Sequence, residues 1–289
     1  MSATFERNES AASPGLRRRR RPPALTTGAL AFLALVVLCL IAGPLIAPQD
    51  PDKQNLLLGA VPPSSAHLLG TDQLGRDVLS RLIVGTRPTL IGPICVAVGA
   101  TLIGSSLGLL AGYRGGTVDA VVSRLADLIF ALPGLLVAVV VIGVLGGGYL
   151  LAVAILIFLS IAWQIRVVRG AALVQARLPY VDAARTLDIS DLRIMGRHIL
   201  PNILVVVLTS FLLDLVAALI SFSGLAFLGL GIPAGSAAWG SMLSDGQGLI
   251  TTNASLSLAP AVLIVLTAAS MTLLGDWFYG VLSSSHEQI

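Results

Sequence analysis

The chain has 289 residues, of which only 11% are charged and 55% are hydrophobic, and its mean hydropathy is +0.91. Water-soluble domains carry about 25% charged residues, so this chain cannot cover a globule with solvated side chains. The low fraction of charged residues excludes soluble enzymes. A net charge of only +3 also argues against a nucleic-acid-binding module.

Residues 1–27 form a tail rich in Ser, Pro and Arg that ends in the run Arg17 to Arg21. This composition is typical of a disordered segment. The apolar run that follows is long enough to span a bilayer and has no cleavage site leading into a soluble domain, so we expect a signal anchor and not a cleaved signal peptide. The chain is thereby divided into a cytoplasmic tail, 1–27, and a transmembrane domain, 28–289.

Uncharged runs indicate where the membrane spans lie. A bilayer core of about 30 Å requires about 20 apolar residues in a helix. The uncharged run 128–165 is therefore too long for one span, and Gly146-Gly147-Gly148 at its middle predict a break. An all-α integral membrane protein with six spans is expected, at about 28–47, 88–112, 128–145, 149–168, 201–220 and 258–278.

The basic residues predict the orientation of these spans. With six spans, 14 of the 18 Lys and Arg fall on one side of the membrane. The other four lie in the loop 48–87, where four aspartates cancel their charge. The positive-inside rule then places both termini in the cytoplasm and the loops 48–87 and 229–257 outside.

Motifs for nucleotide or metal chemistry are missing from the sequence. The one lysine, Lys53, belongs to no Gly-x-x-x-x-Gly-Lys motif, and the three histidines are far apart and outside the expected spans. The stretch Gly104–Gly108 matches Gly-x-Ser-x-Gly, but no span contains a histidine that could act as its base. With Gly112, the same glycines better predict a small-residue face for close helix packing. No cofactor is expected in this chain.

Asp214 lies deep within the fifth expected span. A carboxylate at that depth costs about 2.5–3.5 kcal/mol on the insertion scale, so it needs a reason. One interpretation is a proton or substrate site, and a gradient-driven secondary transporter using Asp214 is the main alternative function. The other is a polar group that faces a subunit interface or a watery cavity. Both stay open on the sequence.

The segment 177–200 lies between the fourth and fifth spans and is neither low in complexity nor rich in turns. We expect one short helix from Pro179 and a second after Ser190 as N-cap. Their expected apolar faces are Tyr180, Ala184 and Leu187 on the first helix and Leu192, Met195 and Ile199 on the second. Such a pair would form a docking surface or, alternatively, a basic hairpin that lies on lipid headgroups.

Three motifs resemble one family. Asp182-Ala183-Ala184 followed by Ile199-Leu200-Pro201 resembles the EAA loop of bacterial ABC-importer permeases, and residues 225–243 are similar to a further conserved stretch of that family. The segment 67–90 is similar to the signature of the C-type permease in its dipeptide, oligopeptide and nickel branch. The signature residues are His67, Gly70, Thr71, Asp72, Gly75, Arg76 and Asp77.

The resemblance implies a type I permease subunit in the bacterial inner membrane. It would form a heterodimer with a second permease, two cytoplasmic ATPase subunits or domains that bind ATP and Mg²⁺, and an extracytoplasmic solute-binding protein. Short peptides are the implied substrate, with nickel or a haem-like ligand as alternatives. The implied ATPase-coupling residues are Asp182, Ala183, Ala184, Arg185, Leu187 and Asp188.

Two residues depart from the family pattern in the coupling loop. Asp182 stands where the family has glutamate, and Asp188 stands where it has glycine. Because aspartate tolerates left-handed backbone geometry better than most residues, the turn is expected to survive. The small residues are expected to enter a groove on the ATPase, so that Ala184→Arg would uncouple transport. Asn253-Ala254-Ser255 matches a glycosylation acceptor, which we interpret as a chance match.

Overall fold

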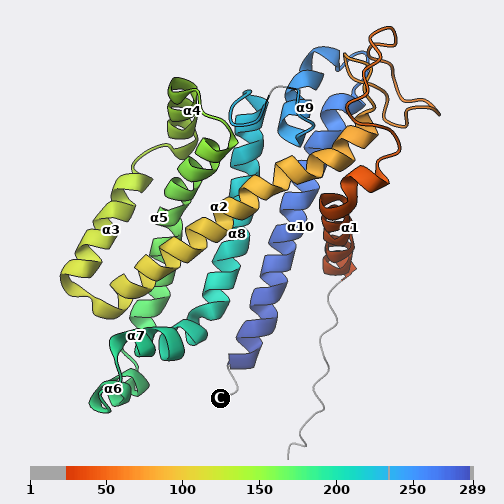
Figure 1. The fold of residues 1–289 in the computed structure, drawn as a ribbon. Helices are drawn as coiled ribbons and strands as arrows, with labels where there is room; N and C mark the ends of the chain where they lie inside the picture. Colours follow the sequence, from red (N-terminus) through yellow and green to blue (C-terminus); the bar gives the residue numbers. More distant parts are fainter. Residues whose placement is uncertain (1–23, 234, 287–289) are drawn as a thin grey trace, which may run out of the picture.

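The computed structural model describes residues 24–233 and 235–286. Of the expected tail, 1–27, residues 1–23 lie outside the described part, and residues 24–27 belong to the first helix. Within this part of the chain all regular structure is helical, apart from one isolated antiparallel bridge between Thr71 and Asp77 (Figure 1). The helices are α1 (Ala24–Ile46), α2 (Val78–Arg114), α3 (Gly116–Phe130), α4 (Gly134–Leu145), α5 (Tyr149–Gln175), α6 (Pro179–Thr186), α7 (Asp191–Arg193), a π-helix (Ile194–Ile199), α8 (Leu200–Phe227), α9 (Trp239–Gly246), a 3₁₀ turn (Gln247–Leu249) and α10 (Ser255–His286).

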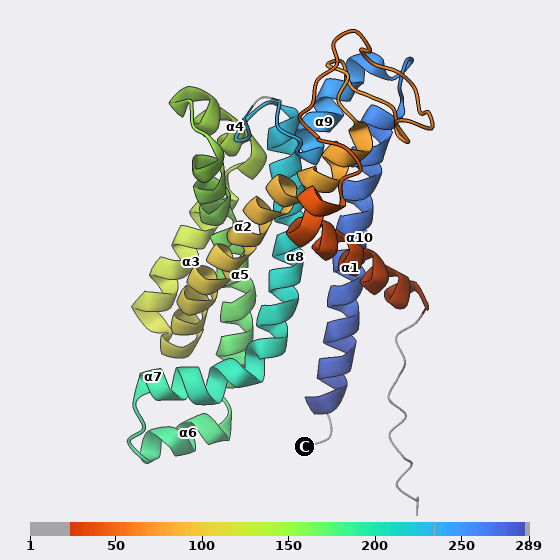
Figure 2. The same cartoon turned by 45° about the vertical axis from the view of Figure 1, so that its right-hand side comes forward.

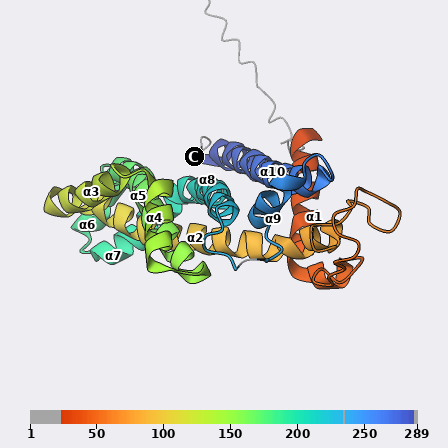
Figure 3. The same ribbon diagram turned by 90° about the horizontal axis from the view of Figure 1, so that it is seen from above.

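Five of these helices are long and apolar enough to cross a membrane: α1, α2, α5, α7 continued into α8, and α10. The pair α3 and α4 makes a sixth crossing if it counts as one broken span, since the two helices are bent by 76°. Seen from above, α5, α8 and α10 lie in a row, and α2 crosses one side of that row (Figure 3).

The third expected span, 128–145, differs most from the structure. Helix α3 begins at Gly116 and ends at Phe130, and α4 begins at Gly134 after Pro133. Proline lacks a backbone N–H and disfavours helical geometry at the residue before it, so Pro133 favours a helix break at this point. The two aspartates of α3 pair with arginines of α5: Asp127 lies 2.7 Å from Arg166, and Asp119 pairs with Arg169.

The second span is longer than its uncharged run. Helix α2 begins at Val78, ten residues before the expected start, and it contains Pro88 and Arg81. The Arg81 side chain is 1% exposed, and its guanidinium donates to the carbonyls of Gly235 and Ser236 at 3.0 and 3.1 Å. A buried charge is tolerated when its donors are satisfied in this way, so an absence of charge was too strict a criterion for the helix.

Helices α2 and α5 meet along the predicted small-residue face, here called the α2–α5 seam (Gly104, Gly108 and Gly112). A Cβ atom on Gly108 would lie 2.8 Å from the Ile165 carbonyl oxygen, and one on Gly112 would lie 2.8 Å from Ala172 Cβ. The packing interpretation of these glycines is therefore confirmed. Small residues let the two backbones approach closely, which is how membrane helices associate.

Candidate functional site

The residues expected to carry function lie in three places. The signature residues belong to the loop cap (residues 47–77 and 235–257), at one end of the bundle. The coupling residues belong to the α6–α7 hairpin (residues 177–199), at the opposite end (Figures 1 and 2). Asp214 lies on α8, between these ends. The structure therefore does not bring the predicted residues together into a single site.

In the loop cap, Asp77 starts helix α2. Its Oδ2 accepts from the Ser80 backbone N–H at 2.8 Å and from the Ser80 hydroxyl at 2.7 Å. Its Oδ1 lies 3.0 Å from His67 Nδ1. An N-cap carboxylate satisfies N–H groups that have no partner inside the helix and complements the helix dipole. Asp77 and His67 therefore define where the loop ends and the helix begins.

Asp72 and Arg76 hold the turn that precedes Asp77. Asp72 Oδ1 accepts from the backbone N–H groups of Leu74 and Arg76 at 2.9 and 3.0 Å. Arg76 Nε donates to Asp72 Oδ2 at 2.7 Å, and both side chains are buried. Charge-assisted hydrogen bonds of this kind are about twice as strong as neutral ones. The pair stabilises the turn in a place where neither charge is free to contact a ligand.

The signature glycines are required by the backbone. Gly70 and Gly75 have φ angles of +75° and +69°. A Cβ atom would lie 2.3 Å from the Val61 carbonyl oxygen at Gly70 and 2.0 Å from the Asn55 carbonyl oxygen at Gly75. Only glycine combines the left-handed conformation with so close an approach to the backbone of another loop segment.

Asn253 joins the two halves of the loop cap. Its side chain is 1% exposed, and its amide nitrogen lies 3.2 Å from each of the carbonyl oxygens of Val61, Leu69 and Thr71. This burial agrees with the interpretation of Asn253-Ala254-Ser255 as a chance match, because a glycosylation acceptor must be accessible. The signature thus builds a folded loop cap that is tied to residues almost 200 positions away.

In the α6–α7 hairpin, the inner face of α6 differs from the expected one. Val181 is fully buried and Ala184 is 6% exposed, whereas Leu187 is 74% exposed. The expected apolar face is confirmed at Ala184 and at the half-buried Tyr180. It was wrong at Leu187, which follows the last residue of this short helix. Ala183 and Leu187 lie on the free side of the hairpin, and Ala184 packs against the bundle.

The second expected helix is not separate. From Asp191 it continues through the π-helix Ile194–Ile199 into α8. The wider turn accommodates Pro201, whose ring would otherwise collide with the carbonyl four residues earlier. Met195 and Ile199 are buried as expected, but Leu192 is 79% exposed and belongs to the free side of the hairpin.

The turn between the two arms depends on Asp188. Its φ is +54°, the only positive φ of a non-glycine residue in the described part of the chain, which confirms that aspartate adopts the left-handed turn in place of glycine. Helix α2 also contacts both arms through Tyr113. The Tyr113 hydroxyl donates to Asp191 Oδ1 at 2.8 Å, and the Arg185 guanidinium lies 5.0 Å from the Tyr113 ring centre. Contact with the Tyr113 hydroxyl raises the pKa of the Arg185 guanidinium.

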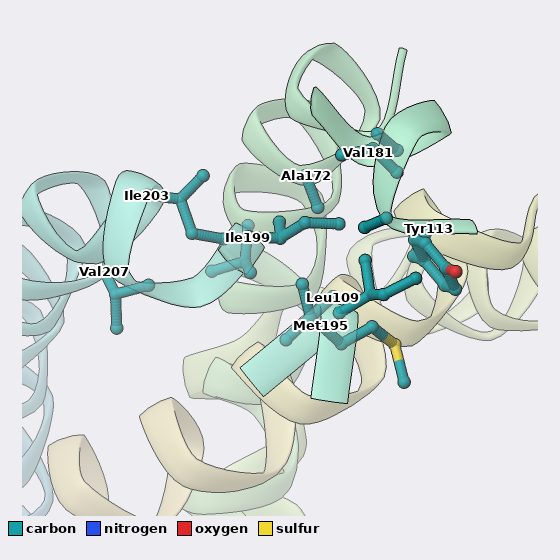
Figure 4. Close-up of a cluster of buried hydrophobic side chains, with 12 residues drawn as sticks. Leu109, Tyr113, Ala172, Val181, Met195, Ile199, Ile203 and Val207 are labelled. Carbon is teal, nitrogen blue, oxygen red and sulfur yellow. The ribbon is translucent and has the colours of Figure 1, made fainter. Parts of the chain in front are cut away.

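A cluster of buried apolar side chains fixes the hairpin to the bundle (Figure 4). Val181, Ile194 and Ile199 are fully buried, and they pack with residues of α2, α5 and α8. Each such side chain contributes about 1.5–3 kcal/mol by leaving water. The hairpin is therefore a rigid extension of the membrane helices, and a displacement of the hairpin would be transmitted to α8.

The third feature is the Asp214 pocket, a cavity of about 360 Å³. Side chains from α3, α4, α5 and α8 line it, among them Phe130, Leu135, Trp163 and Asp214. The Asp214 side chain is 4% exposed, and its Oδ2 atom has no hydrogen-bond partner. The pocket therefore contains a buried acceptor that the described residues leave unsatisfied.

Comparison with known proteins identifies the family. The family described as the binding-protein-dependent transport system inner membrane component matches residues 104–286. The chain belongs to this family. The resemblance inferred from the three motifs is thus confirmed, and with it the inner-membrane location of the chain.

Relatives in this family match most of the chain. An oligopeptide transport system permease protein of Bacillus subtilis is 34% identical over 89% of this chain and 85% of its own length. A glutathione transport system permease protein of Escherichia coli O6:K15:H31 is 38% identical over 90% of this chain and 86% of its own length. A di/tripeptide transport system permease protein of Pseudomonas aeruginosa is 34% identical over 86% of this chain and 84% of its own length.

Solved structures of the same fold include the MetNI methionine ABC transporter in an inward-facing conformation. The structural match covers 69% of this chain and 95% of the solved chain, with a TM-score of 0.57 and 20% sequence identity. The all-helical fold of an ABC-importer permease is thereby established for this chain.

The sequence analysis assigned no structural role to three residues that organise the loop cap of this family member. They are Arg81, Trp239 and Asn253, all at most 1% exposed. The Trp239 indole donates to the Leu82 carbonyl at 2.9 Å, and its backbone N–H donates to the Thr89 hydroxyl at 2.9 Å. A tryptophan in the loop between the fifth and sixth expected spans was the available signal, because an indole seeks burial together with a hydrogen-bond acceptor.

Proposed function

We infer that this chain is one of two permease subunits that together form the translocation pathway of an ATP-driven importer of short peptides. The observation that carries this proposal is the α6–α7 hairpin, a rigid apolar platform held at one end of a membrane bundle. The substrate class is supported by relatives named as permeases for oligopeptides, di- and tripeptides, and glutathione.

The distribution of charge supports a cytoplasmic hairpin. The hairpin contains four arginines: Arg177, Arg185, Arg193 and Arg197. In the loop cap, by contrast, aspartates balance the basic residues. The positive-inside rule then puts the hairpin in the cytoplasm. The C-terminal end of α10 lies toward the hairpin end of the bundle (Figure 1), and six crossings bring the N-terminus to the same side.

The free side of the hairpin has the character of a docking surface. Ala183 is exposed, and Leu187 and Leu192 are 74% and 79% exposed on either side of the Asp188 turn. Burying each leucine against a partner contributes about 1.5–3 kcal/mol, and the small Ala183 side chain permits close approach. We assign this surface, with Asp182 and Arg185 at its polar margin, to the contact with the ATPase.

The energy source is proposed to be external to the chain. No Walker-type motif is present in the sequence, so ATP and Mg²⁺ would be bound by two partner ATPase subunits or domains. A second permease would complete the pathway, and a solute-binding protein would deliver peptide at the loop cap. A gradient-driven transporter using Asp214 is not favoured, because the family and its relatives belong to binding-protein-dependent transport.

Ala183→Arg tests the coupling surface. The guanidinium would have to be buried without a partner in the ATPase interface, which costs several kcal/mol, so co-purification of the ATPase and peptide uptake should each fall at least about tenfold. Gln54→Arg is the matched control for ATPase co-purification, because it adds the same charge to an exposed residue of the loop cap at the opposite end. Normal ATPase binding by Ala183→Arg would contradict the assignment.

Ala184→Arg, which the sequence suggested for this purpose, is a poor test. Ala184 is packed between the hairpin and the bundle, so an arginine there is expected to displace the hairpin itself. A loss of coupling in Ala184→Arg would then report misfolding as much as a lost contact.

A further inference from the structure

The Asp214 pocket holds a carboxylate that takes part in neither the loop cap nor the proposed coupling surface. Within the described residues no ion pair involves Asp214, and the arginines of α5 pair with aspartates of α3: Arg166 lies 2.7 Å from Asp127, and Arg169 pairs with Asp119. The Oδ2 atom of Asp214 is buried and accepts no hydrogen bond. A buried acceptor without a donor is costly, so the arrangement calls for a donor from outside the chain.

The pocket opens at the surface of the subunit. Phe130, Leu135, Trp163 and Leu213 line it, and each is between 41% and 50% exposed. An opening onto lipid tails would leave the carboxylate uncompensated in an apolar solvent. The same opening onto a translocation pathway, shared with a second permease, gives a polar ligand access to Asp214. The pocket is therefore better suited to the pathway than to the lipid face.

The other groups in the walls select the kind of ligand. Ser160, which contacts the Asp214 carboxyl, and Ser221 supply hydroxyls, and the aromatic rings of Trp163 and Phe130 also line the pocket. A hard metal cation takes about six oxygen ligands, more than these side chains provide. An alkylammonium group is a pure donor, and it is attracted both by a carboxylate and by aromatic faces. The cavity of about 360 Å³ also leaves room for the residue that carries the ammonium group.

We propose that the Asp214 pocket binds the protonated amino group of a peptide as it passes through the permease. This inference rests on the proposed function and names a substrate feature that the pathway itself recognises. Asp214 is the charged anchor, and the aromatic and apolar walls accept the adjoining side chain without strong preference. Such a site favours peptides with a free amino terminus over their acylated forms.

Chemical labelling tests the site on the purified complex in lipid nanodiscs. A hydrophobic carbodiimide, which modifies carboxyl groups in apolar surroundings, is applied in the presence of glycyl-leucine or N-acetyl-glycyl-leucine, and modification of Asp214 is followed by mass spectrometry. The free dipeptide should slow labelling about tenfold relative to the acetylated form, as expected for one charge-assisted hydrogen bond. Equal labelling with both compounds would overturn the proposal.

Uptake by variants provides the second readout. Asp214→Asn should lower uptake of glycyl-leucine about tenfold, and Asp214→Glu should recover part of it. Asp276→Asn is the matched control, because it makes the same chemical change on α10, outside the pocket. If Asp214→Asn lowered uptake of free and acetylated peptides equally, the carboxyl would act as a proton site or a structural group and the proposal would fail.

Failure of the proposed function would be recognised separately. It would show in the unmodified complex, as the absence of ATP-dependent uptake or of a co-purifying ATPase, before any Asp214 variant is made. Unchanged uptake by Asp214→Asn in an active complex would instead refute only the ammonium site.

Discussion

Replacing Gly108 by alanine should loosen the α2–α5 seam. The new Cβ atom would lie 2.8 Å from the Ile165 carbonyl oxygen and 3.0 Å from the Arg169 backbone nitrogen. Both neighbours are backbone atoms of a helix, so they cannot rotate away as a flexible side chain would. To restore ordinary contact distances of about 3.5 Å, the two helices must separate by roughly 0.5–0.7 Å.

The cost follows from the contacts that this separation weakens. A gap of about 0.5 Å forfeits roughly a quarter of an attraction of ~0.1–0.2 kcal/mol per atom pair, so on the order of 50 pairs lose about 2 kcal/mol. Alanine returns up to about 1 kcal/mol through its better helix propensity. The net destabilisation expected for Gly108→Ala is therefore about 1 kcal/mol.

Gly170→Ala is the matched control for this prediction. Gly170 also lies within a long helix, α5, but nothing stands within 4 Å of a Cβ atom at that position. Its substitution should stabilise the protein by up to about 1 kcal/mol, so the two variants should differ by about 2 kcal/mol. At roughly 2–4 °C per kcal/mol, Tm should be about 4–8 °C lower for Gly108→Ala than for Gly170→Ala in detergent. Equal Tm values would refute the close-packing argument.

Two further predictions concern the loops. Asn253→Ala leaves the carbonyls of Val61, Leu69 and Thr71 without the amide that joins them. It should destabilise the loop cap by about 1–3 kcal/mol and make the cap more sensitive to added protease. Unchanged protease resistance would argue against this role. Asp188→Val should destabilise the α6–α7 hairpin by about 1–2 kcal/mol, because a β-branched residue disfavours positive φ. Asp188→Gly should not destabilise it. Equal rates of proteolysis for the two variants would contradict the turn assignment.

The sequence predicted those features that depend on local chemistry. Five of the six spans, the break at Gly146, the seam glycines and the left-handed turn at Asp188 are each encoded in a short stretch of sequence. Hydropathy and backbone preference act at that range, so these features could be recognised without knowledge of the fold.

The features that sequence reasoning missed depend on contacts between distant segments. Arg81 enters the membrane helix α2 because carbonyls more than 150 residues later receive its guanidinium. Likewise, Val181 and not Leu187 faces inward, because the position of α2, α5 and α8 decides which side of a two-turn helix is buried. A pattern of apolar residues in so short a helix is compatible with more than one face.

The organisation of the candidate site was predictable only in part. The motifs located the loop cap and the hairpin, but they did not reveal that the signature residues are mostly engaged with one another. They also could not show that Asp214 shares a pocket with Trp163 and Phe130, since these residues come from three different helices. Such groupings depend on the tertiary arrangement of the helices.

Gentle purification of this chain from its native membrane tests the central claim most directly. Co-purifying subunits are identified by mass spectrometry, and ATP hydrolysis is assayed on the same sample. We predict a second multispan permease and a P-loop ATPase in stoichiometric amounts. ATP hydrolysis should co-purify with the unmodified chain and should be largely lost from the Ala183→Arg sample. A homogeneous oligomer without ATPase activity would contradict the assignment of the chain as an importer subunit.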